Sequence, residues 1–160
     1  MSLKMSPKLK MRVEQLQTLR LTEEKINKNL FLVASGVSIV AMAMATIAFF
    51  TRGVFASGQM AMFYLGVVIV YSFHKELVRW LGNEKVGRQG ESFVYGWVGL
   101  TTIFYIIDFL TKGYFSESPA GEPIETIKEM AALTIEVFII FILTRGLKLI
   151  KVAVDRAREV

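Results

Sequence analysis

The sequence predicts an all-α membrane protein whose four transmembrane helices form two antiparallel hairpins. Of its 160 residues, 53% are hydrophobic and 21% are charged, and the mean hydropathy is +0.46. A soluble domain of this size seldom gathers so much apolar sequence into long blocks. A bilayer core about 30 Å thick requires about 20 helical residues to cross it. Four stretches meet this requirement, at about residues 30–51, 54–73, 93–111 and 127–144.

The distribution of basic residues predicts that both termini are cytoplasmic. The formal net charge is +5. Lys and Arg gather in the N-terminal tail, between the second and third stretches, and in the C-terminal tail, whereas the other two connections have few unbalanced cations. Positively charged flanks of this kind stay on the cytoplasmic side of a membrane. We therefore expect a multi-pass protein of the cell membrane, and we do not expect binding to nucleic acid.

Residues 1–21 are expected to form a basic amphipathic segment that lies on the membrane surface. Apolar residues recur there at nearly helical spacing between cations, a pattern typical of helices on anionic membranes. The same apolar face could bind a partner protein instead. The candidate contact residues are Leu9, Val13, Leu16, Lys8 and Arg12.

The transmembrane bundle is expected to occupy residues 22–160. Thr22 is followed by Glu23 and Glu24, which predicts the start of a new helix, because a threonine cap and early acidic residues stabilise a helix N-terminus. That helix leads into the first span. At its far end, residues 51–53 leave room only for a tight turn into the second helix, so the first two spans form a hairpin.

Turn residues delimit the remaining helices. Apolar residues at helical spacing extend the second helix to Leu81, where Gly82-Asn83 supplies a stop. The prolines and glycine of residues 114–123 predict an irregular connection on the outer side. Pro123 at the first helical position can open the fourth helix. This helix is expected to continue beyond its span as a cytoplasmic helical extension.

Two carboxylates inside the predicted spans are the main functional lead. Moving an ionisable group toward the bilayer centre costs roughly 2.5 to 3.5 kcal/mol, so such a group usually faces protein or water. Asp108 lies in the third span and Glu136 in the fourth. Tyr105 shares a helix face with Asp108, and Glu129 shares a face with Glu136. If these faces meet, the four residues form a candidate ion or proton site.

Each carboxylate also has a structural interpretation. Asp108 is only a few residues from its helix end, so it could reach the outer surface or pair with Lys112 or Arg52. Glu136 could be held neutral by burial and by a hydrogen bond from Tyr105 or a threonine hydroxyl. In either case the carboxylate would serve the fold of the bundle.

Small residues on the first span predict close helix packing. They recur on one face, as Ala34, Ser38, Ala41, Ala45 and Ala48. Without a hydrophobic force between helices in lipid, small residues promote association by letting backbones approach. The ridge could pack inside the bundle or against another subunit.

The sequence offers no sign of catalysis or of a bound cofactor. It has no cysteine and a single histidine, His74, which argues against thiolate and multi-histidine metal sites. It has no Walker loop, no nucleophile elbow and no HExxH motif. We therefore expect a non-catalytic subunit, assembly factor or scaffold of a membrane complex, in contact with lipid and with other subunits or copies of itself. The alternative is a homo-oligomeric cation or proton channel or transporter that uses Glu136 and Asp108.

Overall fold

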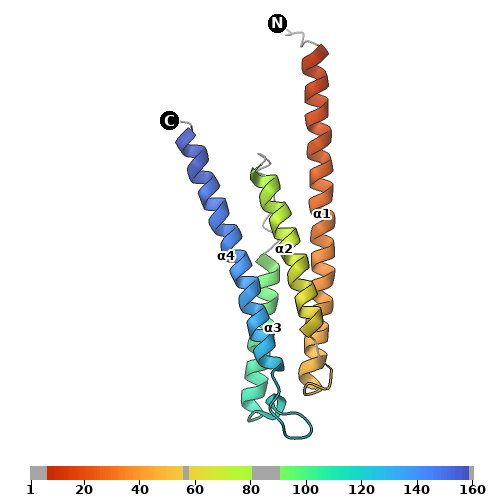
Figure 1. Cartoon of the computed structure of the whole chain (residues 1–160), viewed down its shortest axis with the longest axis vertical. Helices are drawn as coiled ribbons and strands as arrows, with labels where there is room; N and C mark the ends of the chain where they lie inside the picture. Colours follow the sequence, from red (N-terminus) through yellow and green to blue (C-terminus); the bar gives the residue numbers. More distant parts are fainter. Residues whose placement is uncertain (1–6, 56–57, 81–90, 159–160) are drawn as a thin grey trace.

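The computed structural model describes residues 7–55, 58–80 and 91–158, with side chains left out of the description at 7–10, 12, 13, 16, 20 and 158. This part of the chain is all-helical apart from its turns and loops. Its elements are α1 (Pro7–Phe50), α2 (Gly58–Trp80), α3 (Glu91–Leu110), the short 3₁₀ helix η1 (Tyr114–Ser116) and α4 (Thr126–Arg158). Consecutive α-helices run in opposite directions, so α1 begins and α4 ends toward the same end of the bundle (Figure 1).

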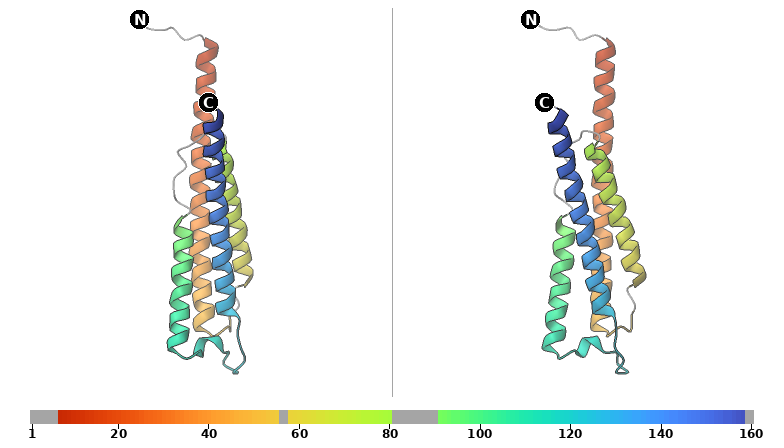
Figure 2. Two further views of the ribbon diagram at one scale, coloured as in Figure 1. Left: turned by 90° about the vertical axis from the view of Figure 1, so that its left-hand side faces the viewer. Right: turned by 60° about the vertical axis from the view of Figure 1, so that its left-hand side comes forward.

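Three of the described helices are long and apolar enough to cross a membrane: α1 within Gln17–Phe50, α2 and α3. With 20 residues, α3 is about 30 Å long at 1.5 Å per residue, which equals the thickness of a bilayer core. The other three helices extend past the start of α3 (Figure 2). We call that end of the bundle the Glu91 end, after the first residue of α3, and the opposite end the Arg52 end.

α1 is one continuous helix of 44 residues, which corrects the expected helix start at Thr22. The Thr22 hydroxyl donates a hydrogen bond to the Thr18 carbonyl at 2.9 Å, and the Thr18 hydroxyl donates to the Glu14 carbonyl at the same distance. Each hydroxyl therefore bonds to the backbone of the preceding helical turn and does not cap the start of a new helix. The surrounding Leu, Arg, Glu and Lys are strong helix formers, so the helix propagates through both threonines.

α4 begins at Thr126, three residues after the position expected from Pro123. Pro123 instead forms an antiparallel bridge with Glu117. The Ile124 N–H then donates to the Ser116 carbonyl at 2.9 Å. These contacts fold the connection back on itself and delay the start of the helix.

The small-residue ridge of α1 lies inside the bundle. Its five members, Ala34, Ser38, Ala41, Ala45 and Ala48, are all buried. α1 packs against α2, which packs against α4, and α4 packs in turn against α3. Large rings fill the interior: Phe49 stacks on Phe104 with ring centroids 4.3 Å apart, and Tyr64 lies 5.4 Å from Trp97. The ridge therefore serves packing within the chain.

α1 and α3 end in the same way at the Arg52 end. The turns 51–53 and 111–113 both read Thr, a cation, Gly. Arg52 and Lys112 have positive φ angles of 54° and 56°, and the glycines that follow them have 74° and 82°. In each turn the glycine N–H donates to the carbonyl five residues earlier, at 2.9 Å for Gly53 and 2.8 Å for Gly113. The two helical hairpins thus share one type of C-terminal cap, in which glycine relieves the strain of the left-handed conformation.

Arg52 joins the two hairpins at this end. Its Nε donates to the Glu117 carbonyl and its Nη2 to the Ser118 carbonyl, both at 2.6 Å. Its guanidinium carbon lies 4.2 Å from the centroid of the Tyr114 ring. One side chain from the first turn therefore holds three residues of the connection between α3 and α4.

Candidate functional site

Asp108 has a well-defined place in the fold. Its Oδ1 accepts a hydrogen bond from the Phe115 N–H at 3.1 Å, and its Oδ2 accepts one from the Ser116 hydroxyl at 2.7 Å. Both partners lie in or beside η1, so the carboxylate closes the turn that leaves α3. It forms an ion pair with neither Lys112 nor Arg52, although the structure describes both. Both of its oxygens thus have partners within the chain.

Glu136 lies in the middle of the apolar part of α4, and its side chain is exposed. It has no hydrogen bond or ion pair with any residue that the structure describes. The threonine nearest to it in the chain, Thr134, bonds instead across the helix interface to Thr101, with their hydroxyl oxygens 2.7 Å apart. The side chains around Glu136 on the outer surface are exposed and apolar: Ile135, Phe138, Ile139, Ile142 and Leu143.

The four residues of the candidate ion or proton site lie at different places: Tyr105 and Asp108 share one depression, Glu129 borders a separate cavity, and Glu136 lines neither. Tyr105 is 48% exposed and lies with Asp108 along a shallow depression at the Arg52 end. Glu129 is exposed and borders a different, small cavity, beside Met130 and Trp97. No hydrogen bond or ion pair links any two of the four. An ion or proton site at these residues stays a prediction.

The predicted surface contacts of the N-terminal segment belong to α1. Leu9, Val13, Leu16, Lys8 and Arg12 all lie in its first part. Their side chains are among those outside the described set. Their contact with lipid or with a partner stays a prediction.

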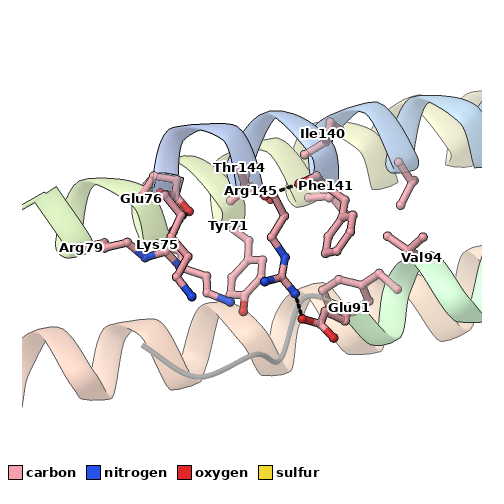
Figure 3. Close-up of a pocket in the computed structure, with 15 residues that line it drawn as sticks. Tyr71, Lys75, Glu76, Arg79, Glu91, Val94, Ile140, Phe141, Thr144 and Arg145 are labelled. Carbon is pink, nitrogen blue, oxygen red and sulfur yellow. Dashed lines mark hydrogen bonds and ion pairs between the residues drawn. The ribbon is translucent and has the colours of Figure 1, made fainter. Parts of the chain in front are cut away.

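A cavity of about 80 Å³ opens between α2, α3 and α4 at the Glu91 end (Figure 3). Its inner wall is apolar and is formed by Val68, Phe93, Val94, Val137, Ile140 and Phe141, with the Tyr71 ring beside them. Polar and charged side chains form the remaining wall: Ser72, Lys75, Glu76, Arg79, Glu91, Thr144, Arg145 and Lys148. We call this group of residues the interfacial cavity.

Two ion pairs cross or border the interfacial cavity. On α2, Arg79 pairs with Glu76, and their side chains are only 14% and 8% exposed. Between helices, Arg145 of α4 pairs with Glu91 of α3 (Figure 3). Lys75 and Lys148 have no ion-pair partner in the described part of the chain. The cavity therefore holds four cations against two carboxylates, a formal charge of +2.

Ring contacts hold two of these cations in place. The Lys75 ammonium lies 5.7 Å from the centroid of the Tyr71 ring, and the Arg145 guanidinium carbon lies 5.2 Å from that of Phe141. Cations within about 6 Å of a ring centroid are attracted by its π electrons. The Tyr71 hydroxyl is buried and has no hydrogen-bond partner among the described residues.

The sequence did not predict the interfacial cavity, because its cations fit the basic flanks that orient a membrane protein. A signal was present, because Ser72, Lys75 and Arg79 recur at three- and four-residue spacing, and Lys148 follows Arg145 by three residues and Thr144 by four. Residues at such spacing share a helix face. Spacing in the sequence does not show that these residues of α2 and α4 face each other, because that depends on the tertiary structure.

No protein-family model, no curated protein and no solved structure matches the sequence. Within residues 7–55, 58–80 and 91–158, no group of three or more His, Asp or Glu side chains is placed to hold a metal ion. The function is therefore inferred from the geometry of this chain.

Proposed function

We propose that the protein is a non-catalytic subunit of a membrane complex, and that a helix of a different subunit covers the Glu136 face of α4. The observation that carries this proposal is an exposed carboxylate without a partner, surrounded by exposed apolar side chains. In water an exposed carboxylate without a protein partner is well solvated. In the hydrocarbon of a bilayer the same group is unfavourable unless another protein surface or water solvates it.

We place α4 across the membrane as the fourth span. It packs against both α2 and α3. Both of these neighbours are long and apolar enough to cross a membrane, and the 20 residues of α3 match the thickness of a bilayer core. From Met130 to Thr144 its only charged residue is Glu136. The cations of the interfacial cavity gather at the Glu91 end, and positive flanks favour the cytoplasm. Accordingly, the Glu91 end and both termini face the cytoplasm.

Contact with lipid is an unfavourable environment for Glu136. A carboxylate near the middle of a span costs roughly 2.5 to 3.5 kcal/mol, and residues of this kind almost always face protein or a water-filled cavity. The side chain cannot turn into the bundle, because the inward positions of this part of α4 are taken by the buried Leu133 and Val137. A second protein surface relieves this cost if it supplies a hydrogen-bond donor or a cation.

The charge favours a partner other than a second copy. In a twofold dimer formed through this face, the same patch meets itself, so two Glu136 carboxylates would come together. Like charges at close range disfavour ionisation of both groups. A helix that carries Lys, Arg, Asn or Gln at the matching depth forms a charge-assisted hydrogen bond instead. A ring of identical chains, with Glu136 against another face, is the arrangement that the transporter alternative requires.

Purification from the native membrane in a mild detergent tests the proposal. The wild-type chain should elute in a complex with a second membrane protein at fixed stoichiometry, and Glu136→Leu should elute without it. Glu129→Leu is the matched control, since it removes an exposed carboxylate from the same helix, nearer its end. Retention of the partner by Glu136→Leu would contradict the proposal. Cation flux through proteoliposomes of the purified chain alone, lost in Glu136→Gln, would favour the homo-oligomeric transporter.

A further inference from the structure

With α2, α3 and α4 placed across a bilayer as proposed above, the interfacial cavity lies at the depth of the lipid headgroups. Glu91, which lines it, is the first residue of α3, the helix whose length equals a bilayer core. Lys75 and Arg79 follow the apolar part of α2, and Arg145 and Lys148 follow that of α4. The charged wall of the cavity is therefore at the boundary between hydrocarbon and water, and its apolar wall faces the hydrocarbon side.

We propose that the interfacial cavity binds a phosphate-bearing anion, supplied either by an anionic phospholipid or by a soluble phosphate. The proposal uses other residues than the one made for Glu136, but it rests on the same placement of the helices in the membrane, with the Glu91 end on the cytoplasmic side. Basic pockets between transmembrane helices on the cytoplasmic side are suited to anionic headgroups.

The charge of the cavity matches such a ligand. The two carboxylates, Glu76 and Glu91, are each paired with an arginine. Lys75 and Lys148 supply the remaining charge of +2, and a phosphate carries one or two negative charges. Only one nitrogen of Arg145 bonds to Glu91. The guanidinium has five N–H donors in a planar fork, so further donors are available for phosphate oxygens.

The Tyr71 ring positions one of the two unpaired cations at this site. The ring lines the cavity, and the Lys75 ammonium lies 5.7 Å from its centroid. Cations within about 6 Å of a ring centroid are attracted by its π electrons. The ring therefore holds the Lys75 ammonium at the wall of the cavity.

The size of the cavity restricts the ligand. A buried water needs about 10 to 15 Å³ of such volume, so 80 Å³ holds a group of about five to eight non-hydrogen atoms. A phosphate fits this description, whereas a large headgroup does not. For a lipid, the phosphate would occupy the charged side of the cavity, and the acyl chains would follow the apolar outer surfaces of α2 and α4.

Native mass spectrometry of the full chain in a neutral detergent tests the proposal, with dioleoylphosphatidylglycerol as the probe and zwitterionic dioleoylphosphatidylcholine as the comparison. The wild-type chain should bind one molecule of the anionic lipid saturably and prefer it to the zwitterionic lipid. Lys75→Gln with Lys148→Gln should weaken binding about 30-fold, since each cation near anionic lipid contributes a factor of about five. Lys75→Arg with Lys148→Arg should keep the affinity.

The matched control is Lys25→Gln with Lys28→Gln, which removes the same charge from exposed positions of α1 outside the cavity and should leave binding unchanged. Competition with millimolar inorganic phosphate shows whether the anion comes from a phospholipid or from a soluble phosphate. Displacement of the lipid indicates a site for soluble phosphate, and failure to displace it indicates a lipid site. Equal binding of both lipids, unchanged binding by the Lys75 and Lys148 glutamine variant, or an equal loss in the control would overturn the proposal. If the glutamine variant does not fold, lipid preference and phosphate competition on the wild-type chain decide.

Discussion

Arg145 of α4 forms an ion pair with Glu91, the first residue of α3, across 54 positions of sequence. The pair joins the two helices at the Glu91 end, while the hydroxyls of Thr101 and Thr134 join them deeper in the bundle. It also neutralises one of the two carboxylates of the interfacial cavity. A single contact therefore contributes both to the packing of the second hairpin and to the charge of the proposed anion site.

Removing this ion pair should have a small effect on stability. The side chains of Arg145 and Glu91 are 43% and 24% exposed, and pairs open to solvent contribute about 0.2 to 1 kcal/mol. We expect a coupling energy of about 0.5 kcal/mol in a double-mutant cycle of Glu91→Gln and Arg145→Gln. The free energy of unfolding in mixed detergent micelles measures it, and the coupling should shrink as salt rises. A coupling that is zero at low salt would show that the pair does not form.

Asp108 should prove to be a structural residue. It accepts two hydrogen bonds, from Phe115 and Ser116, and bonds to charged groups contribute about 1.5 to 3 kcal/mol each when buried. Because the site is only partly buried, we expect Asp108→Ala to destabilise the chain by about 1 to 2 kcal/mol. Ser116→Ala should have a smaller effect in the same direction. Full stability of Asp108→Ala would remove the structural role and restore Asp108 as a candidate for ion binding.

Substitutions at Arg52 can separate the contribution of its side-chain hydrogen bonds from that of its left-handed backbone conformation. Arg52→Ala loses both hydrogen bonds to the connection but keeps a backbone with φ 54°, and we expect a loss of about 1 to 2 kcal/mol. Arg52→Gly loses the same bonds but relieves the left-handed strain, so it should be less destabilising by about 1 kcal/mol.

Lys112 is the internal control for this comparison, because it has nearly the same φ of 56° and no side-chain hydrogen bond to a described residue. Lys112→Ala should be nearly neutral in thermal unfolding, and Lys112→Gly should be neutral or stabilising. If Arg52→Gly is as destabilising as Arg52→Ala, relief of left-handed backbone strain does not contribute at this position.

The position of α3 and of the turn after α1 could be predicted from the sequence because apolar runs and turn residues are local. The span expected at 93–111 corresponds to α3 at Glu91–Leu110, and the turn expected at 51–53 follows directly after α1. The expected start at Thr22 was wrong for a local reason. A threonine followed by glutamates is compatible with a helix cap, but its hydroxyl can equally bond to the preceding turn, as it does here.

The candidate site could be predicted only in part, because it depends on directions that spacing does not fix. The sequence placed Asp108 and Glu136 within apolar helices, yet it could not show that one carboxylate bonds to residues of the following loop and the other points outward. The interfacial cavity is formed by three helices. Its charge balance follows from the pairing of Glu76 with Arg79 and of Glu91 with Arg145, which only the tertiary structure shows.

Site-specific photo-crosslinking in the native membrane tests the central claim, that another subunit covers the Glu136 face, most directly. A photoreactive residue at Ile139, exposed and one helical turn from Glu136, should crosslink to one membrane protein of different sequence. The same residue at Ile103, on the exposed face of α3, is the control and should yield mainly lipid adducts. The crosslink from position 139 should disappear in Glu136→Leu. Lipid adducts alone from both positions, or a crosslink from position 139 only to another copy of this chain, would contradict the account.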